Sequence, residues 1–405
     1  MMRPFRKLLS FEDAKRIMLE GVRPIERKER LSTRNVGGRV LAQGIVSEMD
    51  VPPFDRSAMD GFAVRAEDTF SAGKFEPAEL RIVGKSLAGK PSKSVVEKGE
   101  CIEIATGAKL PGGADAVVKV ENTEVADNTV RVFIPVHPGQ DVSRMGEDIK
   151  TGEKVLRPGS YLDPSNIGVI AALGIEEVDV YERPRIAIIP TGAEVASLGA
   201  RLREGQVYDI NSYTLAQVAL LSGCSPKLWQ IVPDESEALE KALQEALAED
   251  MVVFSGGSSV GETDILVDIL ERGGEVLFHG LQVKPGKPTL CANVEDKLVV
   301  GMPGYPASCL TNAYALLAPV LRRMARIPPE AERYVDAPIS RRVVSSLGRL
   351  QLLTVKVEGG EAIPVYKESG AITSLADADG YIEIPRATEL IEKGEIVRVR
   401  LFRSV

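Results

Sequence analysis

The sequence predicts a multidomain α/β plus β protein whose central part is a doubly wound, mostly parallel α/β domain. From residue 185 onward, short apolar runs alternate with helix-like segments, which is typical of a parallel sheet covered by helices on both faces. On either side of this region, short β-type runs between Gly and Pro turns predict a β-rich insertion domain and a C-terminal β-barrel or sandwich. A helical segment opens the chain.

The N-terminal third supplies the first elements. Ser10 is expected to cap a helix that runs to about Glu20, with Asp13 at the capping-box position. A second helix is expected near residues 33–41 and a third over residues 163–173. The β-rich domain between them contains four expected strands, at residues 80–83, 101–104, 116–120 and 130–134.

The alternating region predicts five strands, at residues 185–189, 227–232, 251–254, 275–279 and 298–301. Four helices are expected between and after them, at residues 211–221, 235–249, 264–272 and 307–326. A Pro328-Pro329 break follows, and after it only strands are expected, at residues 337–344, 350–357, 362–365, 381–385 and 397–402.

Composition excludes several classes of protein. The residues are 44% hydrophobic and 27% charged, as in ordinary globular proteins. A chain of 405 residues is too long for a single compact core, so several domains are expected. The net charge of −8, with scattered basic residues, argues against a nucleic-acid partner. The four cysteines form no CxxC pair and there are two histidines, so a Cys/His zinc site is not expected. Without an apolar run of bilayer length or a signal core, we expect a cytoplasmic protein with no membrane partner.

The candidate site follows from the loops after the expected strands, because ligands of open parallel sheets bind beyond the carboxyl ends of the strands. These loops bring three carboxylates, Glu194, Asp234 and Asp264, and two lysines, Lys284 and Lys287. The turn Ser255-Gly256-Gly257-Ser258-Ser259 leads from a strand to a helix, where backbone N–H groups favour an anion. Carboxylates beside an anion site favour a phosphate held through Mg²⁺ or a similar cation.

Each of these features also has a plainer explanation. A Gly-Gly after a strand is often only a tight turn, and Asp264 or Glu194 could be first-turn acids favoured by a helix dipole. Asp234 could cap the next helix, and Lys284 and Lys287 could be solvated. The convergence of five loops favours a ligand site. No G-x-G-x-x-G or Walker A motif is present, which disfavours a dinucleotide or P-loop site.

Several motifs together resemble the molybdopterin molybdenumtransferase family (MoeA, with the gephyrin E domain in animals). They are Pro52-Pro53-Phe54-Asp55-Arg56-Ser57-Ala58-Met59-Asp60-Gly61-Phe62-Ala63-Val64-Arg65, Ala105-Thr106-Gly107-Ala108, Gly146-Glu147-Asp148-Ile149, the loop over residues 255–264, Lys284-Pro285-Gly286-Lys287-Pro288 and Pro303-Gly304-Tyr305-Pro306. The resemblance implies four domains, at residues 1–50 with 137–182, 51–136, 183–328 (the molybdopterin-binding type of α/β domain) and 329–405.

The resemblance also implies a reaction. Adenylylated molybdopterin and molybdate would react with Mg²⁺-dependent release of AMP, giving molybdenum cofactor. It implies a homodimer whose active site is shared between subunits, and a molybdopterin adenylyltransferase is a candidate protein partner. Whether the oxyanion is molybdate or tungstate stays open.

The same resemblance assigns the site residues. The catalytic set is Asp60, Thr106, Asp148, Glu194 and Asp264. The set expected to bind the substrates is Asp234, Ser255, Gly256, Gly257, Ser258, Ser259, Lys284, Lys287, Pro303, Pro306 and Ser308. The metal ligands would be Glu194, Asp234 and Asp264.

Three positions depart from the family pattern: Arg56 and Tyr305 stand where Asn is usual, and Ala193 where Asp is usual. These three differences do not remove any of the main acidic residues. The preference of the protein for a particular metal ion and for molybdate or tungstate stays open. Two alternatives to this transferase remain. One is a pterin- or oxyanion-binding scaffold or sensor without turnover, and the other is an adenylyltransferase acting one step earlier, which the additional domains disfavour.

Overall fold

A computed structural model of the chain describes residues 8–256, 265–329, 333–365 and 371–402. The chain divides into two compact units. The large unit comprises residues 1–29, 38–40 and 179–405, and the small unit comprises residues 30–37 and 41–178. In the described residues, no helix is both long and apolar enough to span a bilayer.

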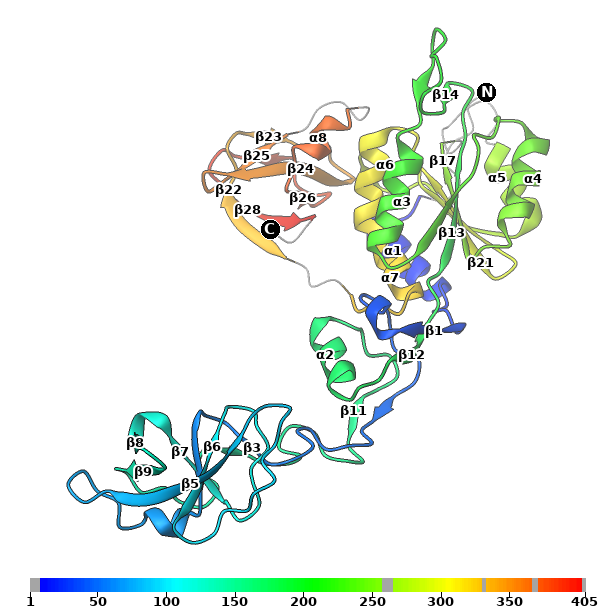
Figure 1. Cartoon of the computed structure of the whole chain (residues 1–405). Helices are drawn as coiled ribbons and strands as arrows, with labels where there is room; N and C mark the ends of the chain where they lie inside the picture. The colour runs from blue at the N-terminus through cyan, green and yellow to red at the C-terminus, as the bar shows by residue number, and fades with distance from the viewer. Residues whose placement is uncertain (1–7, 257–264, 330–332, 366–370, 403–405) are drawn as a thin grey trace. The chain divides into compact units, whose positions relative to one another are not determined.

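A six-stranded sheet forms the centre of the large unit (Figure 1). Its strands, in spatial order, are β16 (Ser225–Leu228), β13 (Arg185–Pro190), β17 (Met251–Ser255), β21 (Lys297–Met302), β20 (Leu290–Val294) and β18 (Glu275–His279). The first four are parallel, and β20 runs antiparallel to both of its neighbours. The predicted mostly parallel sheet is therefore confirmed, and β18 points the same way as β21.

Helices cover both faces of this sheet, as a doubly wound fold requires (Figure 1). On one face lie α3 (Asn211–Leu221) and α6 (Pro306–Asn312), and on the other α4 (Ser236–Ala246) and α5 (Ile265–Gly273). The apolar residues of α4 and α5 pack with Phe254 and Val252 of the central strand in one buried cluster. Burial on both faces explains why β17 is apolar throughout.

The last helix of this domain differs from its prediction. Residues 307–326 were expected to form one long helix, whereas the structure has α6, a π-helical turn (Ala313–Leu317) and α7 (Ala318–Met324). Pro319 explains the change, because proline lacks the N–H that an α-helix needs and its ring crowds the preceding turn. The N-terminal helix α1 (Phe11–Gly21) packs on α7, and the predicted cap is confirmed by the 3.0 Å bond from Asp13 N to Ser10 Oγ.

The C-terminal part of the large unit is a second six-stranded sheet. Its strands, in spatial order, are β19 (Val283–Lys284), β24 (Leu350–Glu358), β26 (Gly380–Ile384), β28 (Ile396–Leu401) and β22 (Tyr334–Pro338), with β25 (Glu361–Pro364) on β24. Leu353, Ile382 and Val399 belong to its core. Two smaller elements accompany it, the pair β23 (Val343–Val344) with β27 (Leu390–Ile391) and the short helix α8 (Thr373–Ala376). Because β19 comes from the loop after β18, this sheet joins the α/β domain directly.

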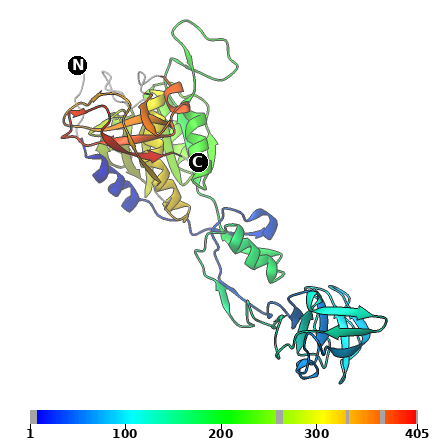
Figure 2. The ribbon, with the colours of Figure 1, turned by 90° about the vertical axis from the view of Figure 1, so that its left-hand side faces the viewer.

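An arm follows β13 in the large unit and stands out from the sheet (Figure 2). It is built on the two-residue strands β14 (Val195–Ala196) and β15 (Val207–Tyr208), which pair in parallel. Elsewhere in the chain, β1 (Lys28–Ser32) and β12 (Glu177–Tyr181) lie where the chain passes from one unit to the other.

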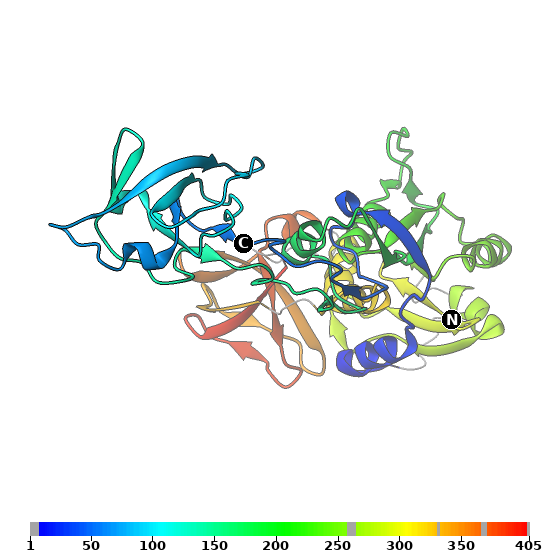
Figure 3. The ribbon, with the colours of Figure 1, turned by 60° about the horizontal axis from the view of Figure 1, so that its bottom comes forward.

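The small unit confirms the predicted β-rich domain (Figure 3). Its sheet runs, in spatial order, β7 (Ala116–Lys119), β4 (Gly61–Val64), β6 (Glu100–Ile104), β5 (Ala78–Ser86), β9 (Thr129–Val132) and β8 (Thr123–Ala126). Phe62, Leu80 and Val118 are buried in its core. The remaining elements are two short pairs, β3 (Arg56–Ser57) with β10 (Val142–Ser143) and β2 (Ile45–Val46) with β11 (Lys154–Leu156), the 3₁₀ turns at Ala66–Thr69 and Val120–Asn122, and α2 (Pro164–Ala172).

One prediction for this region is wrong. The helix expected over residues 33–41 is only a 3₁₀ turn at Thr33–Asn35. Gly37 and Gly38 follow at once, and Gly38 adopts φ +73°, which stops a right-handed helix.

Candidate active site

Five loops leave the same edge of the large unit's sheet, because β13, β16, β17, β18 and β21 all point toward it. Backbone hydrogen bonds join the loops that follow β13, β16, β17 and β21. Val232 N donates to Pro190 O at 2.9 Å, Thr191 N to Ser255 O at 3.0 Å, and Gly256 N to Met302 O at 3.3 Å. These hydrogen bonds join four of the five loops whose convergence is predicted, and the lysine loop after β18 is not among them.

Gly256 lies at a close approach between two of these loops. Its φ is +94°, and a Cβ there would lie 2.6 Å from Thr191 O. A Cβ on Gly304, in the loop after β21, would lie 3.8 Å from the Gly256 Cα. Only glycine satisfies both the backbone angle and the spacing at residue 256. The predicted residues Gly257, Ser258, Ser259 and Asp264 lie outside the described residues, whereas Ser255 ends β17 and is buried.

Two predicted acids lie near enough to each other at this sheet edge for their charges to interact. The pKa of the Asp234 carboxyl is raised, first because the carboxylate is partly desolvated and then because the negative charge of Glu194 is nearby. The Thr191 side chain acts in the opposite direction and lowers this pKa. Asp234 does not cap the following helix, since α4 has Glu235 at its N-cap and no side-chain cap bond. The plainer explanation for Asp234 is therefore excluded.

Glu194 reaches this position through a tight turn. Gly192 adopts φ +128°, and a Cβ at that residue would lie 2.7 Å from Glu194 Oε2. The carboxylate therefore folds back over the glycine toward the sheet edge. Among the described residues, no group of three or more His, Cys, Asp or Glu side chains is placed to hold a metal ion. Glu194 and Asp234 make two carboxylates, which is the number that Mg²⁺ commonly takes from a protein when phosphate oxygens complete its shell.

The lysine loop after β18 is held by a buried asparagine of α6. Asn312 Nδ2 donates to Gly286 O at 3.1 Å and to Thr289 Oγ1 at 2.8 Å. Gly286 has φ +98°, and a Cβ there would lie 2.2 Å from Asn312 Nδ2. Lys284 is half-buried, and its Nζ donates to Ser346 Oγ of the C-terminal domain at 3.2 Å. Lys284 is therefore a structured residue and not a freely solvated one.

The loop after β21 is held in the same manner by α3. Asn211 Nδ2 donates to Gly304 O at 2.8 Å, and Asn211 itself is buried. In this loop Pro303 is buried and Pro306 opens α6, while Ser308 is only 4% exposed. Tyr305, which stands where the family pattern has Asn, is 66% exposed. The tyrosine therefore faces outward and adds an aromatic surface to the loop.

Reasoning from the sequence missed the residues that hold the loops. They are Thr191, Asp209, Asn211 and Asn312, all of them buried. Asp209 Oδ1 accepts from Ser212 N at 3.0 Å at the start of α3. Asp209 could have been predicted as a helix N-cap, because it stands three residues before Ser212 at the start of an expected helix. Asn312 carried no comparable signal, because its role depends on a loop 26 residues away.

The small unit carries the other predicted catalytic residues. Thr106 N donates to Asp60 Oδ1 at 2.7 Å, and hydrogen bonds from this threonine lower the pKa of the Asp60 carboxyl. Asp60 and Thr106 are therefore brought together from 46 positions apart. Asp148 is exposed, and its backbone N–H donates to Val51 O at 3.0 Å. Arg56, the departure from the family pattern, is also exposed.

Comparisons with known proteins agree along most of the chain. Residues 9–174 match the MoeA N-terminal region (domain I and II), residues 187–323 a probable molybdopterin binding domain, and residues 336–402 the MoeA C-terminal region (domain IV). A putative molybdopterin biosynthesis protein of Methanocaldococcus jannaschii is 36% identical over 376 residues, 90% of each chain. The molybdopterin molybdenumtransferase of Haemophilus influenzae is 30% identical over 393 residues, 93% of this chain and 96% of the relative.

Solved structures agree with the sequence comparisons. Two crystal structures of the molybdopterin biosynthesis MoeA protein from Pyrococcus horikoshii match with a TM-score of 0.84. They are 38% and 34% identical to this chain and cover 98% of it and 100% of the solved chains. The chain therefore belongs to the MoeA family, a family of transferases in molybdopterin biosynthesis.

Proposed function

We propose that this chain is a molybdopterin molybdenumtransferase that inserts molybdate into adenylylated molybdopterin and releases AMP, giving molybdenum cofactor. Relatives from Haemophilus influenzae and Staphylococcus aureus carry that enzyme name at 30% and 29% identity. The observation that carries the proposal is that Glu194 and Asp234 lie within electrostatic reach of each other at the sheet edge, where such folds bind ligands.

The acid pair fits a divalent cation. Partial desolvation and, after it, the negative charge of Glu194 raise the pKa of Asp234, so a bound Mg²⁺ would relieve an unfavourable interaction that the folded protein contains. Asp264 is proposed as the third ligand. When bound, Mg²⁺ neutralises charge on the adenylate phosphate and polarises its phosphoryl group. Glu194 and Asp264 are the proposed groups that orient the attacking water.

Polar groups around the acids are proposed to bind the anions. Lys284, Lys287 and Ser308 would contact the oxyanion, and the N–H groups of residues 255–259 would contact phosphate. Asp234, Pro303 and Pro306 would contact the pterin. The two buried asparagines that hold the lysine and proline loops would keep these contacts in place without touching the ligand.

The small unit is proposed to complete the site in a homodimer, where Asp60, Thr106 and Asp148 of one subunit serve the sheet edge of the other. The ionised Asp60, held by Thr106, would supply a fixed negative charge or accept a substrate proton. In this proposal the enzyme works in the cytoplasm and receives its substrate from a molybdopterin adenylyltransferase. Molybdate is the proposed oxyanion, with tungstate as its competitor.

The test is AMP release from adenylylated molybdopterin, measured with molybdate or tungstate and with Mg²⁺ or a chelator. We expect AMP only with oxyanion and cation together, and more of it with molybdate than with tungstate. Binding of the substrate without AMP release under any condition would identify a scaffold or sensor instead. Consumption of ATP with unadenylylated molybdopterin would identify an adenylyltransferase.

A further inference from the structure

Three neighbouring segments of the small unit carry the residues that are proposed to complete the active site. The segment that ends at Asp60 lies in the middle. On one side, Ser57 N donates to Ala108 O at 2.9 Å, in the segment that carries Thr106. On the other side, β3 of the middle segment pairs with β10, which precedes the segment that carries Asp148. The three predicted residues therefore belong to one hydrogen-bonded group of loops.

The loop that carries Asp148, from Met145 to Thr151, is held at both ends by aspartates of the middle segment. Before Asp148, Met145 N donates to Asp55 Oδ1 at 2.7 Å. After it, Thr151 N donates to Asp50 Oδ1 at 2.8 Å, and the threonine hydroxyl donates to the same oxygen at 3.1 Å. Asp148 lies midway between these two contacts. The two aspartates therefore fix the ends of the Asp148 loop.

The backbone of the Asp148 loop is fixed, whereas the side chain of Asp148 is exposed. Asp148 N donates to Val51 O at 3.0 Å, and Gly146 N donates to Pro52 O at 3.0 Å. A carboxylate that is exposed on a held backbone suits a group that must be directed at a ligand, because its direction is set before the ligand arrives. The holding contacts therefore matter for function as well as for the fold.

Asp55 is itself held by an arginine. Arg144 Nη1 donates to Asp55 Oδ2 at 2.7 Å, and the two side chains are 51% and 35% exposed. The hydrogen bond from Met145 N lowers the pKa of the Asp55 carboxyl, partial desolvation opposes this, and Arg144 lowers the pKa further. An exposed ion pair contributes little to the free energy of unfolding. Its effect here is to direct the Asp55 carboxylate toward Met145.

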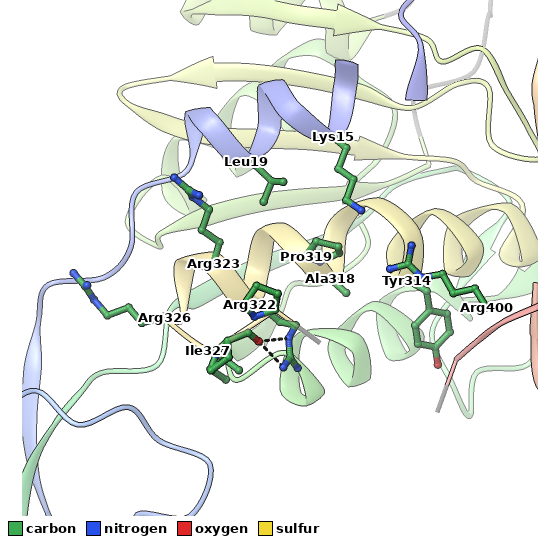
Figure 4. Close-up of a pocket in the computed structure, with 12 residues that line it drawn as sticks. Lys15, Leu19, Tyr314, Ala318, Pro319, Arg322, Arg323, Arg326, Ile327 and Arg400 are labelled. Carbon is green, nitrogen blue, oxygen red and sulfur yellow. Dashed lines mark hydrogen bonds between the residues drawn. The ribbon is translucent and has the colours of Figure 1, made fainter. Parts of the chain in front are cut away.

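Arg322 of the large unit offers a comparison (Figure 4). It donates to Pro328 O through Nε at 3.2 Å and through Nη2 at 2.8 Å, which ties α7 to the chain that follows it. Neither residue belongs to the five loops of the candidate active site. Arg144, in contrast, contacts an acid that holds the loop of a predicted catalytic residue. Arg322 is therefore a matched control for Arg144.

We propose that Asp55 is a positioning residue for turnover, which fixes the Asp148 loop so that the Asp148 carboxylate keeps one direction relative to Asp60 and Thr106. Small displacements of a catalytic group lower a rate strongly while the fold stays intact. The inference rests on the proposed function, because Asp148 contributes to turnover only there. Its geometric part, that Asp55 restrains the Asp148 loop, does not need the reaction and is measured separately.

Amide hydrogen exchange of the full chain tests the geometric part. In Asp55→Ala, the N–H groups of Gly146 and Asp148 should exchange at least about tenfold faster than in the wild type. Neither of these groups is bonded to Asp55, so faster exchange would report release of the whole loop. The N–H group of Thr106 should keep its rate. Unchanged exchange at Gly146 and Asp148 would overturn the proposal.

Asp68→Ala is the matched control for Asp55→Ala. Asp68 Oδ2 also accepts from a backbone N–H, that of Gly99, at 2.9 Å. This bond lies at the opposite ends of the antiparallel strands β4 and β6 from Asp60 and Thr106. The control should leave exchange in the Asp148 loop unchanged. Thermal unfolding verifies that each variant is folded, and Asp55→Asn, which keeps an acceptor oxygen, replaces Asp55→Ala if that variant does not fold.

AMP release tests the functional part. Asp55→Ala should lower kcat about tenfold and change the KM for adenylylated molybdopterin less than about twofold, because direction and not binding is lost. Arg144→Gln should lower kcat about threefold, since the bond from Met145 remains, whereas Arg322→Gln should keep the wild-type kcat. Adding Asp55→Ala to Asp148→Asn should lower kcat no further. A further tenfold loss in that double variant would show that Asp55 does not act through Asp148.

The wild-type protein separates this inference from the proposed function. If the wild type releases no AMP, the proposed function fails, and the exchange rates alone decide whether Asp55 restrains the Asp148 loop. If the wild type is active and Asp55→Ala keeps the same kcat as Asp68→Ala, the proposed function stands and the positioning role of Asp55 is overturned.

Discussion

Two aspartates in different units of this chain show opposite electrostatic behaviour. Asp234 at the sheet edge has a raised pKa, because it is partly desolvated and lies near Glu194. Asp60 in the small unit has a lowered pKa, because Thr106 donates hydrogen bonds to it and its surface position costs little desolvation. The same side chain is thus destabilised as an anion in one unit and stabilised as an anion in the other.

The difference in pKa indicates that the two aspartates have different functions. A pair of acids that repel each other gains most from a cation, which suits a Mg²⁺ site for a phosphate ester. A single carboxylate held by a backbone N–H is already ionised and fixed in direction. It suits a group that positions a substrate or carries a permanent charge. Variants of the two aspartates and of their neighbours test this contrast.

Neutralising the acid pair should have the largest effect on turnover. We expect Glu194→Gln or Asp234→Asn to lower the rate of AMP release by about 100-fold, which corresponds to about 2.7 kcal/mol in the barrier. The reason is that each change removes a carboxylate from the proposed cation site. Glu237→Gln, on the exposed surface of α4, is the control and should retain the wild-type rate.

The same variants have a second, independent readout in stability. Because its pKa is raised, ionised Asp234 lowers the stability of the fold as the pH rises from 3.8 through the raised pKa. Without Mg²⁺ at neutral pH, Asp234→Asn should therefore melt no lower than the wild type. Added Mg²⁺ should raise the melting temperature of the wild type only. An equal Mg²⁺ response in both proteins would contradict a cation at this pair.

Filling the space beside Asn312 should have the next largest effect. Gly286→Ala places a Cβ 2.2 Å from Asn312 Nδ2 at φ +98°, so either the lysine loop or the asparagine must move. We expect a loss of about 3 kcal/mol in unfolding free energy and about tenfold in AMP release. Denaturant unfolding and the AMP assay measure these two effects.

Gly348→Ala is the matched control for backbone strain. Gly348 has φ +82°, and a Cβ there would meet nothing within 4 Å. This variant should lose only about 1 kcal/mol, through the unfavourable φ, and should keep its rate of AMP release. Similar losses in both variants would show that the contact with Asn312 has no special importance.

The sheet edge could be predicted from the sequence because its signals are local. A parallel sheet follows from alternating strand and helix patterns, and strand direction alone brings Glu194, Asp234 and Ser255 to one edge. Strand β20 could not be found in this way. Its turn uses Glu295 and Asp296 at φ +51° and +61°, where the expected Asn-Gly signal is missing.

Long-range support was also beyond prediction from the sequence. Asn312 binds the Gly286 loop only because α6 lies beside that loop in the folded chain, and no spacing in the sequence indicates that contact. Asp60 and Thr106 were assigned through family motifs, and their hydrogen bond depends on a strand pairing that joins distant residues. The loop residues could therefore be predicted from the sequence, whereas the residues that fix their positions could be identified only from the structure.

Asp60 should show a small effect on stability that depends on pH. Because its pKa is lowered, the ionised carboxylate stabilises the fold above 3.8, and this contribution is lost as the pH falls through the lowered pKa. Asp60→Asn should therefore unfold more easily than the wild type at neutral pH and equally at the acid end of the range. Denaturant unfolding across the pH range measures the difference. Glu121→Gln, exposed in the same unit, is the control.

The smallest effect is expected where the C-terminal domain touches the site. Ser346 Oγ accepts from Lys284 Nζ at 3.2 Å on an exposed surface, so Ser346→Ala should cost less than about 1 kcal/mol in stability. Lys284→Gln should raise the KM for molybdate about tenfold, because a cation is lost from the proposed oxyanion site, whereas Ser346→Ala should change it less than about twofold. If both variants raised this KM equally, the serine would be what directs the lysine. The C-terminal domain would then contribute to the function of the sheet edge by orienting Lys284, in addition to the acid pair.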